Sequence, residues 1–182
     1  MALAVGIDLR GSRRRPTGLA SFDGRLLRTR VAFSDEEILG FVRDLSPVAV
    51  AIDAPLSMAS GYRLVDREMI RRGYRVLPPG WKGMRVLVER AIYIASELAR
   101  EGYVVVETHP LSSLKSSRCS SAAELFSALG IAASPYSTKD ELDAAIAALT
   151  AFYYARGLYE VVSSADGAIV LLPGICGAGR RE

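Results

Sequence analysis

The order of elements in the first 53 residues constrains the fold more than any other feature of the sequence. An apolar run at residues 4–9 ends at a polar turn and has the length of a buried strand. Two further strand-like runs, residues 17–22 and 26–33, flank Asp23-Gly24, which is a strong signal for a tight hairpin. A tight hairpin makes consecutive strands antiparallel neighbours, so the chain opens with a three-stranded meander.

A helix and a fourth strand follow the meander. Ser34 and Glu37 have the spacing of a capping box, which predicts a helix from about residue 35 to residue 45. Pro47 ends this helix, and the apolar run 48–52 predicts a strand that stops at Asp53. Because a helical crossover joins parallel strands, the fourth strand should run parallel to the first.

The rest of the chain alternates helices, loops and strands. We expect helices at 63–72, 84–100, 122–129 and 138–156, strands at 103–106, 158–163 and 168–172, and loops at 76–83 and 112–121. The serine-rich loop 112–121 should be mobile, and the tail 174–182 should be frayed. The whole predicts one α/β domain over residues 1–182, with a mixed five-stranded central sheet flanked by helices and a separate C-terminal strand pair.

Composition narrows the class of protein. Half of the residues are hydrophobic and 24% are charged, which is typical of a globular chain. No apolar run reaches the eighteen or so residues that span a bilayer, and the N-terminus carries an early acid in place of a basic leader. Cys119 and Cys176 are too few for a disulfide framework or a zinc site. These features predict a cytoplasmic protein with no membrane partner.

The side-chain inventory has two biases. The sequence contains no Asn and no Gln, and its basic residues are mostly Arg, with Lys only at positions 82, 115 and 139. Loss of thermolabile amides is one habit of heat-adapted proteins, so we expect a thermophilic source. A biased genome composition would also favour Arg and stays open as an alternative.

Basic residues gather in two stretches despite a net charge of only +3. Such runs suit phosphate backbones, although an ordinary solvated surface explains them equally well. The arginines expected to contact nucleic acid are Arg10, Arg13, Arg14, Arg15, Arg71, Arg72 and Arg75.

Three acids share one sequence context. Asp8, Asp53 and Glu107 are each the first acid after an apolar strand. If the three strands are parallel, their carboxylates emerge at one edge of the sheet, where α/β proteins bind ligands. They would repel one another unless a cation or a shared proton intervened, and oxygen ligands of this kind suit Mg²⁺ or Mn²⁺. Taken singly, each acid is as well explained as a turn or cap residue.

The long helix and the only histidine add further candidates. Asp140 and Asp143 lie three residues apart, on one side of the predicted helix. Alanines after Asp143 would let this helix lie close to the sheet and carry Asp143 inward, whereas Asp140 has the position of an ordinary N-terminal helix acid. His109, two residues beyond Glu107, could position a water or phosphate or act as acid or base, unless it is a lone surface histidine. Motifs for serine-elbow or phosphate-loop chemistry are absent from the sequence.

Motifs spread in order over nearly the whole chain resemble the domain-of-unknown-function family 429. They are Gly6-Ile7-Asp8, Ile52-Asp53-Ala54-Pro55, Arg75-Val76-Leu77-Pro78-Pro79-Gly80, Glu107-Thr108-His109-Pro110, and the stretch from Asp140 through Ala144 to Gly157. That family is regarded as RNase H-like and is described as a predicted nuclease. The opening also resembles the RuvC and YqgF resolvases, whose late helix carries a similar Asp-x-x-Asp-Ala step.

The resemblance implies a role for each matching acid. Asp8 matches the first-strand aspartate, Asp53 the fourth-strand acid, and Asp143 the late-helix aspartate, with Asp140 as its helper. Glu107 belongs to the family pattern but has no clear counterpart in the resolvases. Resolvases usually carry a glutamate after the fourth strand, and the shorter Asp53 would draw a metal closer to the sheet or leave it water-bridged.

Three functions from different classes remain open at this point. The leading one is a metal-dependent phosphodiesterase acting on DNA or RNA, with Mg²⁺ or Mn²⁺ held by Asp8, Asp53, Glu107 and Asp143. The second is a nucleotide-binding phosphotransferase related to the actin and sugar-kinase superfamily, which normally needs two such domains. The third is a nucleic-acid-binding protein without catalysis. Resolvases work as dimers, so the resemblance also implies a homodimer, although no dimer face is visible in the sequence.

Overall fold

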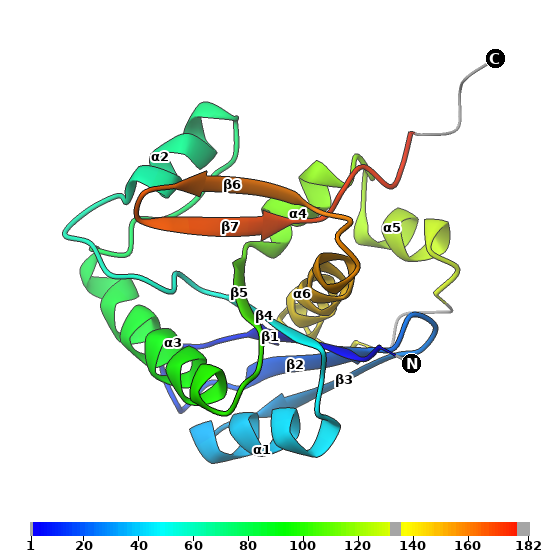
Figure 1. Ribbon diagram of the computed structural model, residues 1–182, viewed down its shortest axis with the longest axis horizontal. Coiled ribbons are helices and arrows are strands. Elements are labelled where there is room, and N and C mark those ends of the chain that lie inside the picture. The colour runs from blue at the N-terminus through cyan, green and yellow to red at the C-terminus, as the bar shows by residue number, and fades with distance from the viewer. Residues whose placement is uncertain (1, 132–135, 178–182) are drawn as a thin grey trace.

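The computed structural model describes residues 2–131 and 136–177, and within them seven strands form one mixed sheet in the order β3-β2-β1-β4-β5-β7-β6 (Figure 1). The strands are β1 (Ala4–Asp8), β2 (Thr17–Phe22), β3 (Leu27–Ala32), β4 (Ala49–Asp53), β5 (Val105–Thr108), β6 (Glu160–Ser164) and β7 (Gly167–Leu171). The helices are α1 (Asp35–Leu45), α2 (Leu64–Arg71), α3 (Lys82–Arg100), α4 (Pro110–Ser116), α5 (Ala122–Ala128) and α6 (Lys139–Ala155).

Strand direction decides where the acids can meet. β1 is antiparallel to β2 and parallel to β4, as the hairpin and the helical crossover predict. β5 is parallel to β4, and β7 is parallel to β5. The C-terminal ends of β1, β4, β5 and β7 therefore share one edge of the sheet.

The prediction of five central strands with a separate C-terminal pair is wrong, because the pair joins the central sheet. β7 pairs with β5 through Glu107 with Ile169 and Thr108 with Val170, and β6 follows as the edge strand. Alternate β7 residues are buried on both faces: Ile169 contributes to an apolar cluster with α2, and Val170 to the core beneath α6. A hairpin left outside the sheet could not bury both of these faces.

Helices cover both faces of the sheet, with α6 on one face and α1 and α3 on the other (Figure 1). α6 lies in direct contact with the strands because the facing residues are small. A Cβ on Gly6 of β1 would come within 2.1 Å of the Ala144 carbonyl oxygen, and one on Gly18 of β2 within 2.0 Å of the Asp140 carbonyl oxygen. These two glycines therefore fix the start of α6 beside the end of β1.

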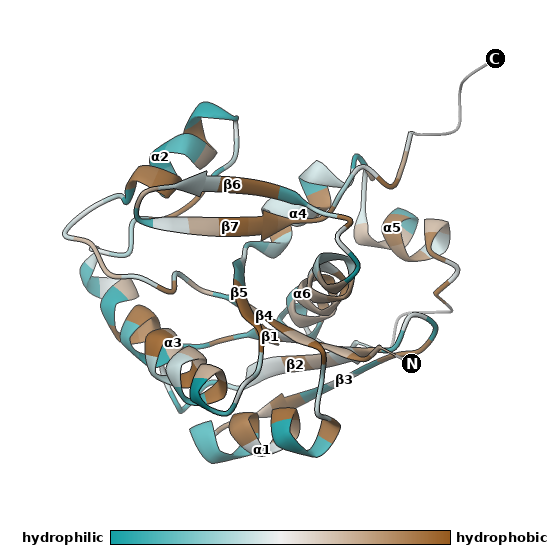
Figure 2. Ribbon diagram, in the orientation of Figure 1, coloured by the Kyte–Doolittle hydropathy of each residue, from teal (hydrophilic) through white to brown (hydrophobic). Residues whose placement is uncertain are grey.

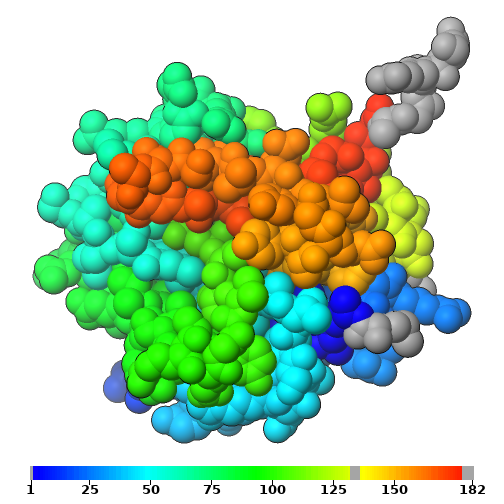
Figure 3. Space-filling model, in the orientation of Figure 1, coloured from blue at the N-terminus to red at the C-terminus, as the bar shows by residue number. Residues whose placement is uncertain are grey.

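The pattern of hydropathy follows this layering. Apolar residues occupy the strands and the inner faces of α1 and α3, while polar residues lie on the outer faces (Figure 2). In the space-filling view the β6–β7 hairpin and the end of α6 lie next to each other, above α3 (Figure 3). No helix among the described residues is long and apolar enough to cross a membrane.

The predicted mobile loop at residues 112–121 is wrong in its first half, which is helix α4. Pro110 occupies the first turn of α4, where its missing N–H costs nothing. The serine hydroxyls find partners inside the protein: Ser116 donates to the Leu172 carbonyl at 2.7 Å, and Ser113 accepts from Thr150 at 3.1 Å. Serine composition indicates a loop only where these hydroxyls would face water.

The two cysteines form a disulfide, Cys119–Cys176, with a Cα–Cα distance of 5.0 Å. Beside it, the N–H groups of Ile175 and Cys176 both donate to the Ser117 carbonyl at 2.9 Å. The prediction of a frayed tail is therefore wrong for residues 174–177, and the remainder of that tail lies outside the described residues. Because they are bonded to each other, the two cysteines give no support to the predicted reducing compartment.

Candidate active site

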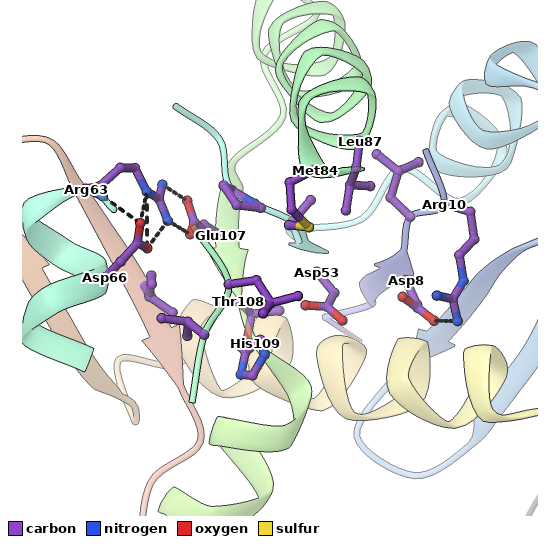
Figure 4. A pocket seen from close by; sticks show the side chains of 16 residues that line it. Asp8, Arg10, Asp53, Arg63, Asp66, Met84, Leu87, Glu107, Thr108 and His109 are labelled. Carbon is purple, nitrogen blue, oxygen red and sulfur yellow. Dashed lines mark hydrogen bonds and ion pairs between the residues drawn. The ribbon is translucent and has the colours of Figure 1, made fainter. Parts of the chain in front are cut away.

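A pocket of about 240 Å³ opens at the C-terminal edge of the sheet, where β1, β4 and β5 end. Ile7 pairs with Ile52, so Asp8 and Asp53 leave neighbouring parallel strands side by side and both line the pocket (Figure 4). His109 comes from the end of β5. The parallel strands therefore bring two of the predicted acids together.

Asp8 is buried, and its carboxylate has no close counter-charge. Its Oδ2 atom has no hydrogen-bond partner among the described residues, and the nearest cation is the Arg10 guanidinium at 3.6 Å. That guanidinium forms its close hydrogen bond with Asp140 instead. Burial raises the pKa of Asp8 to about 7, and the negative charge of Asp143 adds to the increase, while Arg10 opposes it.

Asp53 has a similar environment. No hydrogen bond joins its carboxylate to another described residue, although the side chain is partly exposed in the pocket. Loss of hydration raises the pKa of Asp53 well above its usual value, and the charges of Asp8 and Asp143 raise it further. Each acid thus lies within electrostatic range of the others.

The two aspartates of α6 are held by different cations. Asp140 pairs with Arg10, and Asp143 pairs with Lys139 one turn earlier on the same helix. Both side chains are partly exposed, at 19% and 17%. The structure therefore groups Asp143 electrostatically with the two strand-end aspartates, and it connects Asp140 to them through Arg10.

Glu107 lies apart from this group, although its sequence context matches that of Asp8 and Asp53. Its two oxygens accept hydrogen bonds from Arg63 at 2.5 and 2.7 Å, and one of them also accepts the Leu56 N–H at 2.8 Å. Arg63 is 2% exposed and also pairs with Asp66. Burial raises the pKa of Glu107 while Arg63 lowers it, so this acid has a fixed counter-charge. In Figure 4 its carboxylate points to Arg63 and away from the aspartates.

Arg63 and Asp66 are pocket residues that the sequence did not single out for this role. Burial acts to lower the pKa of Arg63, but hydrogen bonds to Glu107 and Asp66 raise it above its usual value. The guanidinium therefore stays charged. An Arg-x-x-Asp step at the start of a helix was the only available signal, and it does not reveal a partner on another strand.

His109 is held on one side and open on the other. Its Nδ1 lies 2.7 Å from the Ser112 hydroxyl, and its ring lines the same pocket as Asp53 (Figure 4). Burial lowers the pKa of His109, and Asp143 opposes that change. A neutral ring at neutral pH could donate or accept one hydrogen bond from its second nitrogen.

The carboxylate oxygens in the pocket are of the kind that bind a hard divalent cation, but the side chains do not converge on one point. No three His, Cys, Asp or Glu side chains within residues 2–131 and 136–177 come close enough together to hold a metal ion. The unpartnered oxygen of Asp8 and the free carboxylate of Asp53 fit Mg²⁺ or Mn²⁺. Glu107 does not fit, because Arg63 occupies both of its oxygens.

The predicted nucleic-acid arginines divide into two sets. Four form ion pairs within the protein: Arg10 with Asp140, Arg13 with Asp35, and both Arg71 and Arg72 with Glu68. The side chains of Arg14, Arg15 and Arg75 are exposed and make no hydrogen bond or ion pair within the described part of the chain. Only the second set is wholly available to an outside anion.

Comparison with known proteins gives a likeness of fold. No family model matches the chain, and no curated protein matches it. A structure of Thermus thermophilus RuvC in complex with Holliday junction substrate is similar, with a TM-score of 0.55, 18% sequence identity, and coverage of 86% of this chain and 96% of that chain. A second Thermus thermophilus RuvC structure has a TM-score of 0.48 at 18% identity, covering 85% and 96% of the two chains. The predicted fold class is thus confirmed apart from its strand count: this chain has the RNase H-like fold of RuvC.

Proposed function

We propose that this protein is a metal-dependent nuclease that hydrolyses phosphodiester bonds, and that it is a member of the domain-of-unknown-function family 429. One observation carries the proposal. Asp8 and Asp53 end neighbouring parallel strands in one pocket, without a close hydrogen-bonding cation and within range of the charge of Asp143. A set of like charges held in this way is stabilised by a bound cation.

In this proposal Asp8, Asp53 and Asp143 hold Mg²⁺ or Mn²⁺, and the ion supplies an activated water and charge stabilisation of the leaving oxygen. Asp143 would leave its ion pair with Lys139 in order to bind the metal. Arg10 holds Asp140 and neutralises part of the charge on Asp8. His109, fixed by Ser112, orients a water or a phosphate oxygen with its second nitrogen.

Glu107 takes a positioning role in place of the metal-binding role that its sequence context indicates. Its Oε2 accepts the N–H of Leu56, three residues beyond Asp53, at 2.8 Å. Arg63 fixes Glu107 in turn, through two hydrogen bonds. The pair therefore sets the course of the backbone that leaves β4 and presents Asp53 to the pocket.

The proposed substrate is nucleic acid. The RuvC structure with this fold contains a Holliday junction substrate, and exposed arginines lie on the chain near the pocket. A cytoplasmic location and a homodimer remain part of the proposal. A disulfide is compatible with the cytoplasm of a heat-adapted host, because intracellular disulfides are common in hyperthermophiles.

The test is cleavage of labelled single-stranded, duplex and branched DNA and RNA in Mn²⁺, Mg²⁺ or EDTA. We expect metal-dependent cleavage that Asp53→Asn reduces by roughly a hundredfold or more. Asp44→Asn, which removes an exposed acid of α1, is the matched control and should keep full activity. ATP turnover without cleavage would indicate a phosphotransferase, and binding without turnover would indicate a non-catalytic binder; either outcome contradicts the proposal.

A further inference from the structure

A groove lies beside the acidic pocket, on the side of α4 and β7. One wall is the irregular segment 72–77 that follows α2, and the other wall is residues 109–118, which include α4. Two adjoining hollows of about 310 and 350 Å³ make up the groove, and both are lined by Tyr74 and Lys115. We name it the basic groove.

Along both walls, residues that line the acidic pocket lie close in the chain to residues that line the groove. Val76 and His109 line the acidic pocket itself. Arg75 and Ser112 line the nearer hollow of the groove, and Arg118 lines the farther one. Six residues of extended chain span at most about 20 Å, so the groove lies within that distance of Val76, which lines the acidic pocket.

The lining of the groove is mainly basic. Its lining contains four cations and one acid, which gives a net charge of +3 from Arg72, Arg75, Lys115 and Arg118 against Glu160. The side chains of Arg75 and Arg118 are exposed and form no hydrogen bond or ion pair with the described residues. Lys115 bridges the walls, because its Nζ donates to the Gly73 carbonyl at 2.8 Å and lies 5.6 Å from the centre of the Tyr74 ring.

The backbone conformation of Arg118 also favours a binding role for this residue. Arg118 has a φ of +62°, in the left-handed region where a side chain other than glycine or asparagine is unfavourable. Its side chain extends over Gly174, beside the end of β7. An arginine with no internal partner is thus held at an unfavourable position on the wall of a cationic groove.

We propose that the basic groove binds the phosphate backbone of a single nucleic-acid strand and leads that strand to the acidic pocket. The proposal rests on the proposed nuclease function and deepens it. Phosphates along a strand match a line of cations, and hollows of this volume have the size of a small-molecule site rather than of a duplex. Leu111, which is 67% exposed in the nearer hollow, offers an apolar contact for a sugar or base.

The experiment measures binding of a fluorescent oligothymidylate by anisotropy, in EDTA, over a series of salt concentrations. The groove variant is Arg75→Gln/Lys115→Gln/Arg118→Gln. Because each phosphate contact contributes about 0.7 to the slope of log K against log salt for a single strand, the slope should fall by about 2. The control variant, Arg25→Gln/Arg28→Gln/Arg156→Gln, removes the same charge at the opposite end of the sheet, and its slope should match the wild type.

Each result separates the two proposals. An equal fall in both variants would overturn the groove and leave nucleic-acid binding in place. A wild type that binds no oligonucleotide would overturn both. A fall confined to the groove variant, in a protein that never cleaves with Mn²⁺, would support the groove and contradict the nuclease. If the triple variant fails to fold, Arg75→Gln and Arg118→Gln alone carry the test, with a fall in slope of about 0.7 each.

Discussion

Asp8→Asn in the metal-free protein should raise stability at pH 8 and leave it nearly unchanged at pH 4. The pKa of Asp8 is about 7 in the folded protein, against an ordinary value of 3.8. Below pH 4 the carboxyl group is protonated in both folded and unfolded chains, so the aspartate costs nothing. Between pH 4 and 7 the unfolded chain ionises first, and the free energy of unfolding falls as pH rises.

The magnitude follows from the same two pKa values. Each pH unit between them is worth about 1.4 kcal/mol, so the ionised Asp8 costs the folded state roughly 4 kcal/mol above pH 7. Asparagine removes this cost and loses the attraction of Arg10 at 3.6 Å. We therefore expect a net gain of about 2–4 kcal/mol at pH 8, or roughly 5–15 °C in the midpoint of thermal unfolding.

The assay is thermal and urea unfolding in EDTA at pH 4, 6 and 8, for the wild type, Asp8→Asn and the exposed control Asp44→Asn. The difference between wild type and Asp8→Asn should open between pH 4 and 7, and the control should follow the wild type throughout. A difference of constant size at all three pH values, or an Asp8→Asn protein less stable at pH 8, would refute the reasoning.

Adding the metal should narrow or remove the stability difference between the wild type and Asp8→Asn. A cation that binds only the folded protein stabilises it by about 2.7 kcal/mol when its concentration is a hundred times its Kd. Mn²⁺ should therefore stabilise the wild type at pH 8 and stabilise Asp8→Asn much less. Equal stabilisation of both proteins would remove Asp8 from the metal site.

Four further outcomes are expected. Asp143→Ala should lower the rate of metal-dependent cleavage by roughly a hundredfold or more, while Asp140→Ala should lower it less. Cleavage and thermal unfolding are measured together for both variants. A larger loss of cleavage in Asp140→Ala would exclude Asp143 as the helix ligand. Arg63→Ala should lower stability by about 3–5 kcal/mol in urea unfolding, because two buried acids lose their partner, and a loss below about 1 kcal/mol would contradict this. Cys119 and Cys176 are 57 positions apart in the sequence, so reducing their disulfide should lower the free energy of unfolding by about 4 kcal/mol. The stability of the double alanine variant should not change when reductant is added. The oxidised wild type should melt well above 50 °C if the source is heat-adapted, and a midpoint near that temperature would exclude such a source.

Features that depend on near neighbours in the chain could be predicted. The Asp23-Gly24 turn joins β2 to β3, and Ser34 with Glu37 forms the capping box of α1. Directions of β1, β2 and β4 followed from the lengths of their connections. Because parallel strands end at one edge, the neighbouring positions of Asp8 and Asp53 followed as well.

Features that depend on distant partners could not be predicted. β7 joins β5 after α4, α5 and α6 have intervened, and no local pattern specifies which strand a returning hairpin will choose. The disulfide joins residues 57 positions apart, and two cysteines alone give no sign of pairing. The serines of α4 are bonded to groups on β7 and α6 that only the folded chain brings near.

The three strand-end acids share one sequence context but have different surroundings in the folded protein. Asp8, Asp53 and Glu107 follow the same apolar pattern, yet only Glu107 receives a buried cation with two direct hydrogen bonds. Arg10 is the corresponding cation for Asp8, and it is occupied by Asp140 and stays 3.6 Å away. A charge that is already paired inside the protein gains little from an added cation, whereas a buried unpaired charge gains much.

The paired acid and the unpaired ones act on the same strand end in different ways. Glu107 holds the Leu56 N–H and so fixes the backbone beyond β4, and Asp53 at the end of β4 keeps its carboxylate free in the pocket. Loss of Glu107 should therefore disturb the position of Asp53 through the backbone, whereas loss of Asp53 removes the proposed metal ligand itself. The division follows from one arginine at the start of α2, so Arg63 decides which of the three acids remain available to a metal.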